Sequence, residues 1–314
     1  MGSQRSSRPP VLYDLPNEVL SLILGNFCLH CRNPQETPLA YFPGAQQERE
    51  QPSWYSLDRQ ALYSTCLVSR TLRDIAQAIL YHEFAPGYGD SWRSMQYTWE
   101  WRLTNFLRTV TLRQDLAALV RRLYLSHHLM NEITKDDVEP ALEEAAQARG
   151  IQLSDFLAPF QDLWPTTIRG QYRPSTDELG AMLLACLPNL TCLTLSMMVP
   201  RNTIPMSALS AAGISSLPLE TIDICGSDSN LRHRLGGILE MSFSTLRTLN
   251  LELWDGEDLR SLDLDCLLPN LRNLCITSSR LSLSDLGSLL SCCVALETFI
   301  YEAGESFINL AGCL

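Results

Sequence analysis

The first residues that could do chemistry are two cysteines, Cys28 and Cys31, in the pattern Cys-x-x-Cys. Cysteines at this spacing form redox pairs or supply half of a zinc site. No second pair of this kind follows, so Cys66 or His82 would complete a site only if the fold brought it near. Two thiols at the end of a predicted helix are most often plain thiols, and we therefore expect no metal site and no cofactor.

Other residues of useful chemical type lack the neighbours that a catalytic site needs. His127 and His128 follow a predicted strand, where adjacent side chains point to opposite faces and are poor joint ligands. Gly87-Tyr88-Gly89 lacks the strand, the spacing and the lysine of a phosphate-binding loop. We therefore expect that the protein is not an enzyme. A thiol enzyme would require a lowered pKa at Cys28 or Cys31.

The composition narrows the class of protein. The chain has 314 residues, 46% of them hydrophobic, which suffices for one large or two modest domains. A net charge of -11 argues against nucleic acid or an anionic membrane surface as a partner. No apolar run is long enough to cross a bilayer, and the first residues lack the apolar segment of a secretory signal. An odd number of cysteines, eleven, indicates reduced thiols in the cytoplasm or the nucleus.

A repeated pattern in the second half predicts the fold. Five stretches have the form apolar-x-x-apolar-x-apolar, at steps of 29, 27, 25 and 25 residues: 190–195, 219–224, 246–251, 271–276 and 296–301. These steps match the period of leucine-rich repeats. Helical segments are predicted before the first stretch, at 175–188, and between later ones, at 230–241, 257–269 and 284–293. Strand followed by helix, repeated, predicts an α/β solenoid with parallel strands on the concave side and helices outside.

An earlier copy of the strand pattern lies at 120–125, which is 70 residues before the next one. The gap contains a predicted helix at 136–149, ended by Gly150, and then a loop of about 25 residues. Standard leucine-rich repeats have Asn or Cys three residues after the last strand leucine, whereas this chain has other residues at that position. The solenoid is therefore expected to be irregular; the residues concerned are Met198, Ser227, Trp254, Ser279 and Gly304.

The first part of the chain is predicted to form short helices around a polar insert. Residues 1–11 are polar and are expected to be disordered, and a helix is predicted over 15–27 with Pro16 in its first turn. The segment over about 30–57 is rich in Pro, Gln and Glu, a composition typical of an extended loop. Two short helices with a break near Ser69 are predicted over 58–84.

The stretches LPNEVLSLIL at 15–24 and CLVSRTLRDIAQAILY at 66–81 resemble the F-box, a three-helix module that docks on the Skp adaptor of cullin-type ubiquitin ligases. An F-box followed by leucine-rich repeats is similar to the layout of substrate receptors, here in a variant that resembles those of filamentous fungi. The resemblance implies an F-box at 12–84 with a long insert and an irregular repeat domain at 85–314. It implies a subunit that binds a Skp-type adaptor, and through it a cullin-RING ligase, while the repeats bind an unknown target protein.

The resemblance also assigns residues to adaptor binding, position by position. Leu72 stands where many members of the family have Trp, and the insert lengthens the segment between the helices. The residues assigned to adaptor binding are Leu15, Pro16, Val19, Leu20, Ile23, Leu24, Cys66, Val68, Ser69, Leu72, Leu80 and Phe84.

The strand pattern predicts a target-binding face as well. The positions between the apolar residues alternate toward the open side of the sheet. The exposed columns are expected to be Cys192, Thr194, Ser196; Thr221, Asp223, Cys225; Thr248, Asn250, Glu252; Asn273, Cys275, Thr277; and Thr298, Ile300, Glu302. Acids without Lys or Arg among them predict a neutral or mildly basic target. The residues expected to contact it are Thr221, Asp223, Thr248, Asn250, Glu252, Asn273, Cys275 and Thr298.

Two further questions stay open at this stage. The chain could instead be a scaffold or inhibitor built from leucine-rich repeats, with no part in a ligase, whose front helices only cap the solenoid; adaptor binding separates the two. The residues after the last strand pattern offer only a thin apolar cap, so we expect incomplete capping at that end.

Overall fold

The computed structural model describes residues 15–32, 54–86, 88, 101–125, 129, 135–163, 176–196, 204–225, 231–252, 268–279 and 281–303. The expected disordered lead at 1–11, the predicted helix at 257–269 and the expected thin cap after Ala303 lie outside these residues, apart from the last two positions of that helix.

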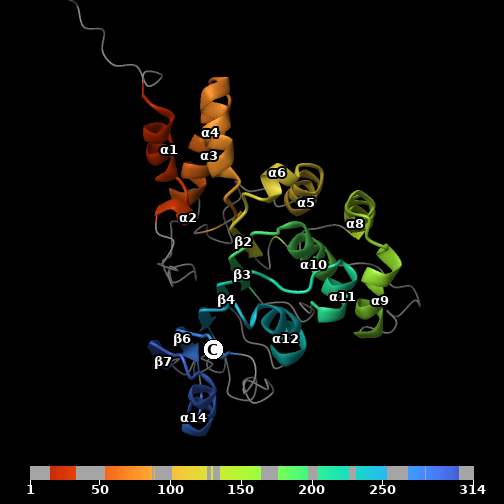
Figure 1. Ribbon diagram of the computed structural model, residues 1–314, viewed down its shortest axis with the longest axis vertical. Helices are drawn as coiled ribbons and strands as arrows, with labels where there is room; N and C mark the ends of the chain where they lie inside the picture. Colours follow the sequence, from red (N-terminus) through yellow and green to blue (C-terminus); the bar gives the residue numbers. More distant parts are fainter. Residues whose placement is uncertain are drawn as a thin grey trace, which may run out of the picture.

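Seven strands form one parallel sheet, in which each strand pairs with the strands before and after it in sequence (Figure 1). A parallel sheet in this sequential order is compatible with a solenoid. The predictions of an α/β fold, of a parallel sheet and of six of its strands are confirmed. The strands are β1 (Glu83–Phe84), β2 (Arg122–Leu125), β3 (Cys192–Ser196), β4 (Thr221–Cys225), β5 (Thr248–Glu252), β6 (Asn273–Ser279) and β7 (Thr298–Ala303).

Neighbouring strands pair so that equivalent positions of the repeated sequence pattern lie opposite one another. Cys192 pairs with Thr221, and the same row continues through Thr248, Asn273 and Thr298. Each position of the pattern therefore forms one row across the sheet. The apolar row next to it is buried and consists of Leu193, Ile222, Leu249 and Leu274 before it reaches Phe299 at the edge.

The helices divide into two groups. Four precede β1 in sequence and stand together at one end of the molecule (Figure 1); they are α1 (Asn17–Gly25), α2 (Leu29–Arg32), α3 (Trp54–Cys66) and α4 (Arg70–Leu80). We call them the helical module. The others are α5 (Arg102–Leu112), α6 (Gln114–Ala117), α8 (Lys135–Arg149), α9 (Leu153–Leu163), α10 (Thr176–Cys186), α11 (Met206–Ala211), α12 (Leu231–Ser242) and α14 (Leu283–Cys292).

The main core lies between the sheet and the helices from α5 to α12. Strand residues such as Leu123 and Ile222 meet helix residues such as Met182, Phe156 and Phe160 there, and all of these are fully buried. Burial of side chains of this size, at about 25 cal/mol per Å² of apolar surface, is the main favourable contribution to folding. Helix α14 lies at the opposite end of the sheet from the helical module (Figure 1).

One predicted helix is confirmed, and two segments predicted as loops are partly helical. The helix predicted at 136–149 is α8, which ends at Gly150, a residue with a φ of 69°. The loop expected after Gly150 contains α9, because Phe156 and Phe160 lie one turn apart and bury their rings together, which outweighs Pro159 between them. The insert expected at about 30–57 contains α2 and the start of α3, so its two ends are helical, while 33–53 lie outside the described residues.

The helical module has a small core of its own. Helix α4 packs against both α1 and α3. The break predicted near Ser69 is confirmed, since the Ser69 hydroxyl caps α4 by accepting a hydrogen bond from the Leu72 amide at 3.2 Å. The residues of this core are Leu24, Cys28, Leu62, Cys66, Ala76 and Ile79.

Close packing between the helices of the repeats predicts a difference between two helical glycines. A Cβ atom at Gly237 in α12 would lie 2.6 Å from the Met206 backbone nitrogen and 2.9 Å from the Ile204 carbonyl oxygen. A Cβ at Gly287 in α14 would meet nothing within 4 Å. We expect Gly237→Ala to lower the free energy of unfolding by about 1–3 kcal/mol, because backbone must move to make room.

Gly287→Ala is the matched control in the same type of element. It should leave stability unchanged or raise it by up to about 1 kcal/mol, because alanine has the higher helix propensity. Urea unfolding followed by circular dichroism measures both variants. Equal effects in the two would contradict the close approach of α12 to the segment that precedes α11.

Candidate functional site

Helix α1 carries two apolar faces. Leu20 and Leu24, one turn apart, are buried toward the rest of the helical module. Val19, Leu22 and Ile23 form a second face at helical spacing and are 37%, 74% and 41% exposed. A helix that is apolar on both faces is normally covered on both. The outer face of α1 therefore has the character of a contact surface.

A second group of exposed apolar residues lies where α3 ends and turns toward α4. Tyr63, Leu67 and Val68 are each more than half exposed. The turn itself is held by the Leu67 and Val68 amides, which donate to carbonyls of α3 at 3.1 and 3.2 Å. These side chains are therefore presented to solvent by an ordered backbone.

The residues that the resemblance assigned to adaptor binding separate into two sets. Pro16, Val19, Ile23 and Val68 are exposed, Leu15 is partly exposed, and Ser69 serves as the cap of α4. Four of the rest are buried, which corrects their assignment as contact residues, because the helices need their largest apolar side chains to hold each other; the last two, Leu80 and Phe84, are partly buried, and their assignment stays a prediction. Leu20, Leu24, Cys66 and Leu72 are buried, Leu80 packs on the core of the helical module, and Phe84 stacks on Phe106 at 4.0 Å.

The exposed apolar residues of the helical module that were missed in the sequence include Leu22, Leu57, Tyr63 and Leu67. Leu22 stands off the stripe formed by Leu20 and Leu24, and a leucine off the core stripe of a short helix is the signal that could have found it. Leu67 lies in the turn after α3, where helical periodicity gives no information about exposure.

The predicted target-binding face is less exposed than expected. Asp223 accepts a hydrogen bond from the Thr194 hydroxyl at 3.0 Å and another from the Asn250 side-chain amide at 2.6 Å. These three residues, with Cys192 and Cys275, are buried, so the prediction that they are exposed is wrong. The physical reason is that adjacent parallel strands bring short polar side chains within reach of one another, and they bond laterally rather than to solvent.

The exposed part of this face lies toward the last strand. Thr298, Ile300 and Glu302 of β7 are exposed as predicted, and Ile300 is 39% exposed. Thr221, Thr248, Glu252, Asn273 and Thr277 are partly exposed. Asn273 donates to the Thr248 hydroxyl at 3.1 Å, so the lateral bonding extends into this row. The side chains of Ser196 and Cys225 are outside the described part of the structure.

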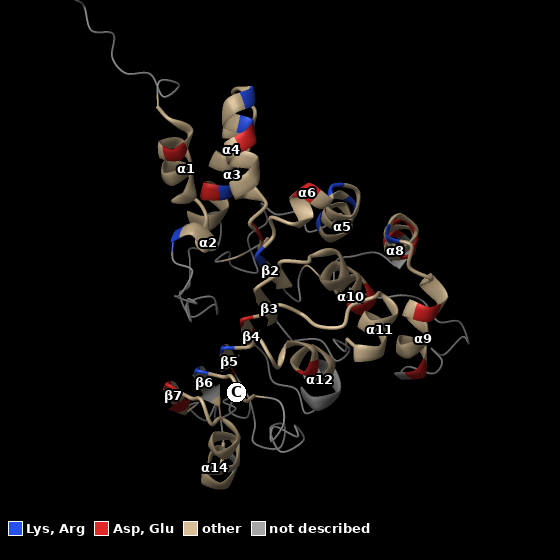
Figure 2. Ribbon diagram, in the orientation of Figure 1, with Lys and Arg blue, Asp and Glu red and all other residues tan. Residues whose placement is uncertain are grey.

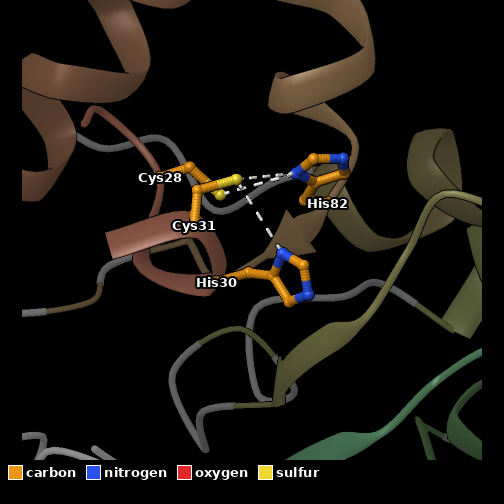
Figure 3. Close-up of side chains that lie close together, drawn as sticks. All are labelled: Cys28, His30, Cys31 and His82. Carbon is orange, nitrogen blue, oxygen red and sulfur yellow. Dashed lines mark hydrogen bonds between the residues drawn. The ribbon is translucent and has the colours of Figure 1, made fainter. Parts of the chain in front are cut away.

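The thiols of Cys28 and Cys31 meet two histidines (Figure 3). Both sulfur atoms face the Nδ1 atom of His82, at 3.8 and 3.3 Å respectively, and the Nδ1 atom of His30 lies 3.9 Å from the Cys31 sulfur. His82 was one of the two residues that the sequence offered as a complement to the pair. Cys66, the other, lies instead in the core of the helical module.

The buried Glu83 and the partly buried Arg59 hold this arrangement in place. The Glu83 carboxylate accepts the amides of Leu29 and His30 at the start of α2, at 3.1 and 3.2 Å. Arg59 of α3 forms an ion pair with the same carboxylate at 3.4 Å and also donates to the carbonyls of Leu80 and Glu83. Because Glu83 follows His82 directly, these bonds fix α2 beside the histidine.

The two thiols differ in acidity. The hydrogen bond with Cys28 lowers the pKa of Cys31, against the opposing effect of partial burial. The same bond and burial raise the pKa of Cys28. Burial lowers the pKa of His30, which favours its neutral form. Cys31 is therefore the thiol that more readily becomes a thiolate.

The buried Asp223 predicts a pH-dependent stability. Burial raises its pKa above the ordinary value of 3.8, although the bonds from Asn250 and Thr194 oppose this. The folded protein thus holds this proton more tightly than the unfolded chain, so the contribution of Asp223 is full below pH 3.8 and is lost as pH rises through the raised pKa. Asp223→Asn does not titrate.

We expect the stability of the wild type relative to Asp223→Asn to fall across that window, by about 1.4 kcal/mol for each unit between the folded and unfolded pKa. Urea unfolding of both proteins over a series of pH values measures this. Glu302→Gln, at an exposed carboxyl on the same face, is the control. A difference that stays constant with pH would contradict the burial of Asp223.

Within the described residues, no helix is both long and apolar enough to pass through a membrane. A scan against protein-family models gives no match for this chain, and a search of curated proteins gives none either.

Proposed function

We propose that this protein is the substrate-recognition subunit of a Skp-cullin-F-box ubiquitin ligase. The helical module docks a Skp-type adaptor, and the repeats bind the target protein. The single observation that supports this best is the outer apolar face of α1, formed by Val19, Leu22 and Ile23, on a module that stands apart at one end of the sheet. The role is one of binding, not of catalysis, and the site of action is the cytoplasm or the nucleus.

The chemistry of α1 favours a protein partner. Glu18 is the one charged residue of this helix (Figure 2), so its outer face offers apolar contacts with little to solvate it. Exposed apolar side chains gathered on one ordered element are typical of protein-protein contact sites. The exposed residues of the α3–α4 connection supply a second contact of the same kind, which suits an adaptor with an apolar groove or surface.

The resemblance to the F-box agrees with this arrangement of helices. The module consists of α1, α3 and α4 packed together, with the short α2 between α1 and α3, and the two quoted motifs fall on α1 and on the α3–α4 segment. The buried Leu72, in the place of the tryptophan of many family members, packs inside the module. The outer face of α1 would then supply the main part of the adaptor contact.

The open face of the sheet is the proposed target-binding surface. Its exposed residues gather on β7, where Thr298, Ile300 and Glu302 are accessible, and the partly exposed row of Thr248 and Asn273 leads to them. The acid at Glu302 fits a neutral or mildly basic target. The lateral bonds of Asp223 stiffen the neighbouring strands and so hold this surface in a fixed shape.

Docking predicts that the double variant Leu22→Ala with Ile23→Ala loses capture of a Skp-type adaptor. Both side chains are exposed, so their loss should leave the fold intact, and removal of central apolar contacts commonly costs about 2 kcal/mol or more of binding energy, or roughly thirtyfold in affinity. Co-purification with the adaptor, followed by titration calorimetry, measures the effect.

Leu112→Ala is the matched control, because Leu112 is 76% exposed on α5, outside the helical module. It should bind the adaptor as the wild type does. Unchanged capture by the double variant would refute docking through α1. A wild-type chain that binds no adaptor at all would favour the alternative of a scaffold or inhibitor without a role in a ligase.

A further inference from the structure

Four metal-binding side chains converge at the joint between the helical module and the sheet. The ligand atoms of Cys28, His30, Cys31 and His82 all lie within 4.8 Å of one another. Three come from one turn of chain around α2, and the fourth is 51 residues beyond Cys31, just before β1. Convergence of this kind from distant parts of a chain is not produced by the Cys-x-x-Cys spacing alone.

We propose that these four residues bind one zinc ion as a structural site. Two thiolates and two imidazoles are a ligand set that zinc prefers, whereas calcium and magnesium require oxygen ligands. This proposal replaces the expectation from the sequence that the chain has no metal site, which rested on the absence of a second Cys-x-x-Cys pair.

The spacing of the atoms fits a tetrahedral ion. With Zn–S of about 2.3 Å and Zn–N of about 2.0–2.1 Å, tetrahedral ligand atoms stand roughly 3.3–3.8 Å apart. The Nδ1 atom of His82 is 3.3 Å from the Cys31 sulfur and 3.8 Å from the Cys28 sulfur. The Nδ1 atom of His30 is 3.9 Å from the Cys31 sulfur, and all four ligand atoms lie within 4.8 Å of one another, so a closing movement of about 1 Å brings the set to tetrahedral spacing (Figure 3).

Hydrogen bonds around the cluster hold in place the backbone that carries the four ligands. Glu83 binds the amides of Leu29 and His30, and its partner Arg59 braces the end of α4, so the backbone that carries the ligands is held from two sides. The carbonyl of His82 accepts the amides of Arg121 and Arg122 at 2.7 and 3.1 Å, which ties this ligand to β2. Such outer contacts orient ligands in metal sites.

The four protein ligands would occupy all four coordination positions of a tetrahedral zinc ion and would leave none open for a substrate, which is typical of a structural site. Zinc binding would release the thiol protons of Cys28 and Cys31. Its effect would be to fasten α2 to the start of β1, and thereby the helical module to the sheet. The proposal does not depend on what the helical module docks.

The test is the zinc content of the full-length chain, purified without a polyhistidine tag and without chelator. Plasma mass spectrometry should find about one zinc per chain in the wild type. Cys31→Ser and His82→Ala should each reduce this at least tenfold. His82→Cys should keep it, since a third thiolate can replace the imidazole. Cys292→Ser, at a cysteine of α14 outside the cluster, should also keep it.

A second measurement covers variants that fail to fold. The wild-type chain, stripped by chelator under reducing conditions, is titrated with Co²⁺ alone. Intense tetrahedral d–d bands and a sulfur-to-cobalt charge-transfer band should appear and saturate at about one equivalent, and zinc should abolish them. Absence of these bands together with absence of zinc would overturn the proposal, as would another metal in place of zinc or a Cys28–Cys31 disulfide in the purified chain.

Discussion

The buried carboxylate of Glu83 is the constraint on which the rest of the arrangement depends. A charge removed from water is tolerated only if it is fully paired, and removal of one partner from such a pair is strongly destabilising. Glu83 satisfies this with Arg59 and with two amides of α2. A strand of two residues is thereby joined to α2 and α3 at once, and the position of α2 relative to the sheet follows from this requirement.

The sheet and the helical module differ in which side chains they bury. On the sheet, polar side chains such as Asp223 and Asn250 bond laterally to one another, so that the middle of the open face is buried and its accessible part lies toward β7. On the helical module, apolar side chains such as Leu22 and Val68 remain outside after the core is complete. The module is therefore one part of the described chain where apolar surface on an ordered element stays uncovered.

The sequence predicted six of the seven strands, because a strand pattern that repeats at a nearly constant step indicates parallel strands in sequential order. It missed β1, whose two residues fall at the end of a segment that was predicted to be helical. The sequence did not predict which residues of the open face are exposed. The alternation of apolar and polar residues along a strand predicts which side of the sheet a side chain points to, but it does not predict hydrogen bonds between neighbouring strands, such as that between Thr194 and Asp223. The resemblance to the F-box also assigned Leu20 and Leu72 to adaptor binding, although both are buried. A resemblance gives the position of a residue in a motif, but it does not give how far that residue is buried. The approach of His82 to Cys31 depends on Glu83 and could not be found from spacing.

The order of the sheet has a consequence for how the chain folds. Pairing of β5 with β6 and of β6 with β7 joins residues 25 apart, whereas pairing of β2 with β3 joins Arg122 to Cys192, which are 70 apart. Closing the longer loop costs about 0.9 kcal/mol more in chain entropy, in proportion to the logarithm of its length. Nucleation is thus favoured among the later strands, with growth toward β1, so that the helical module reaches its final position last.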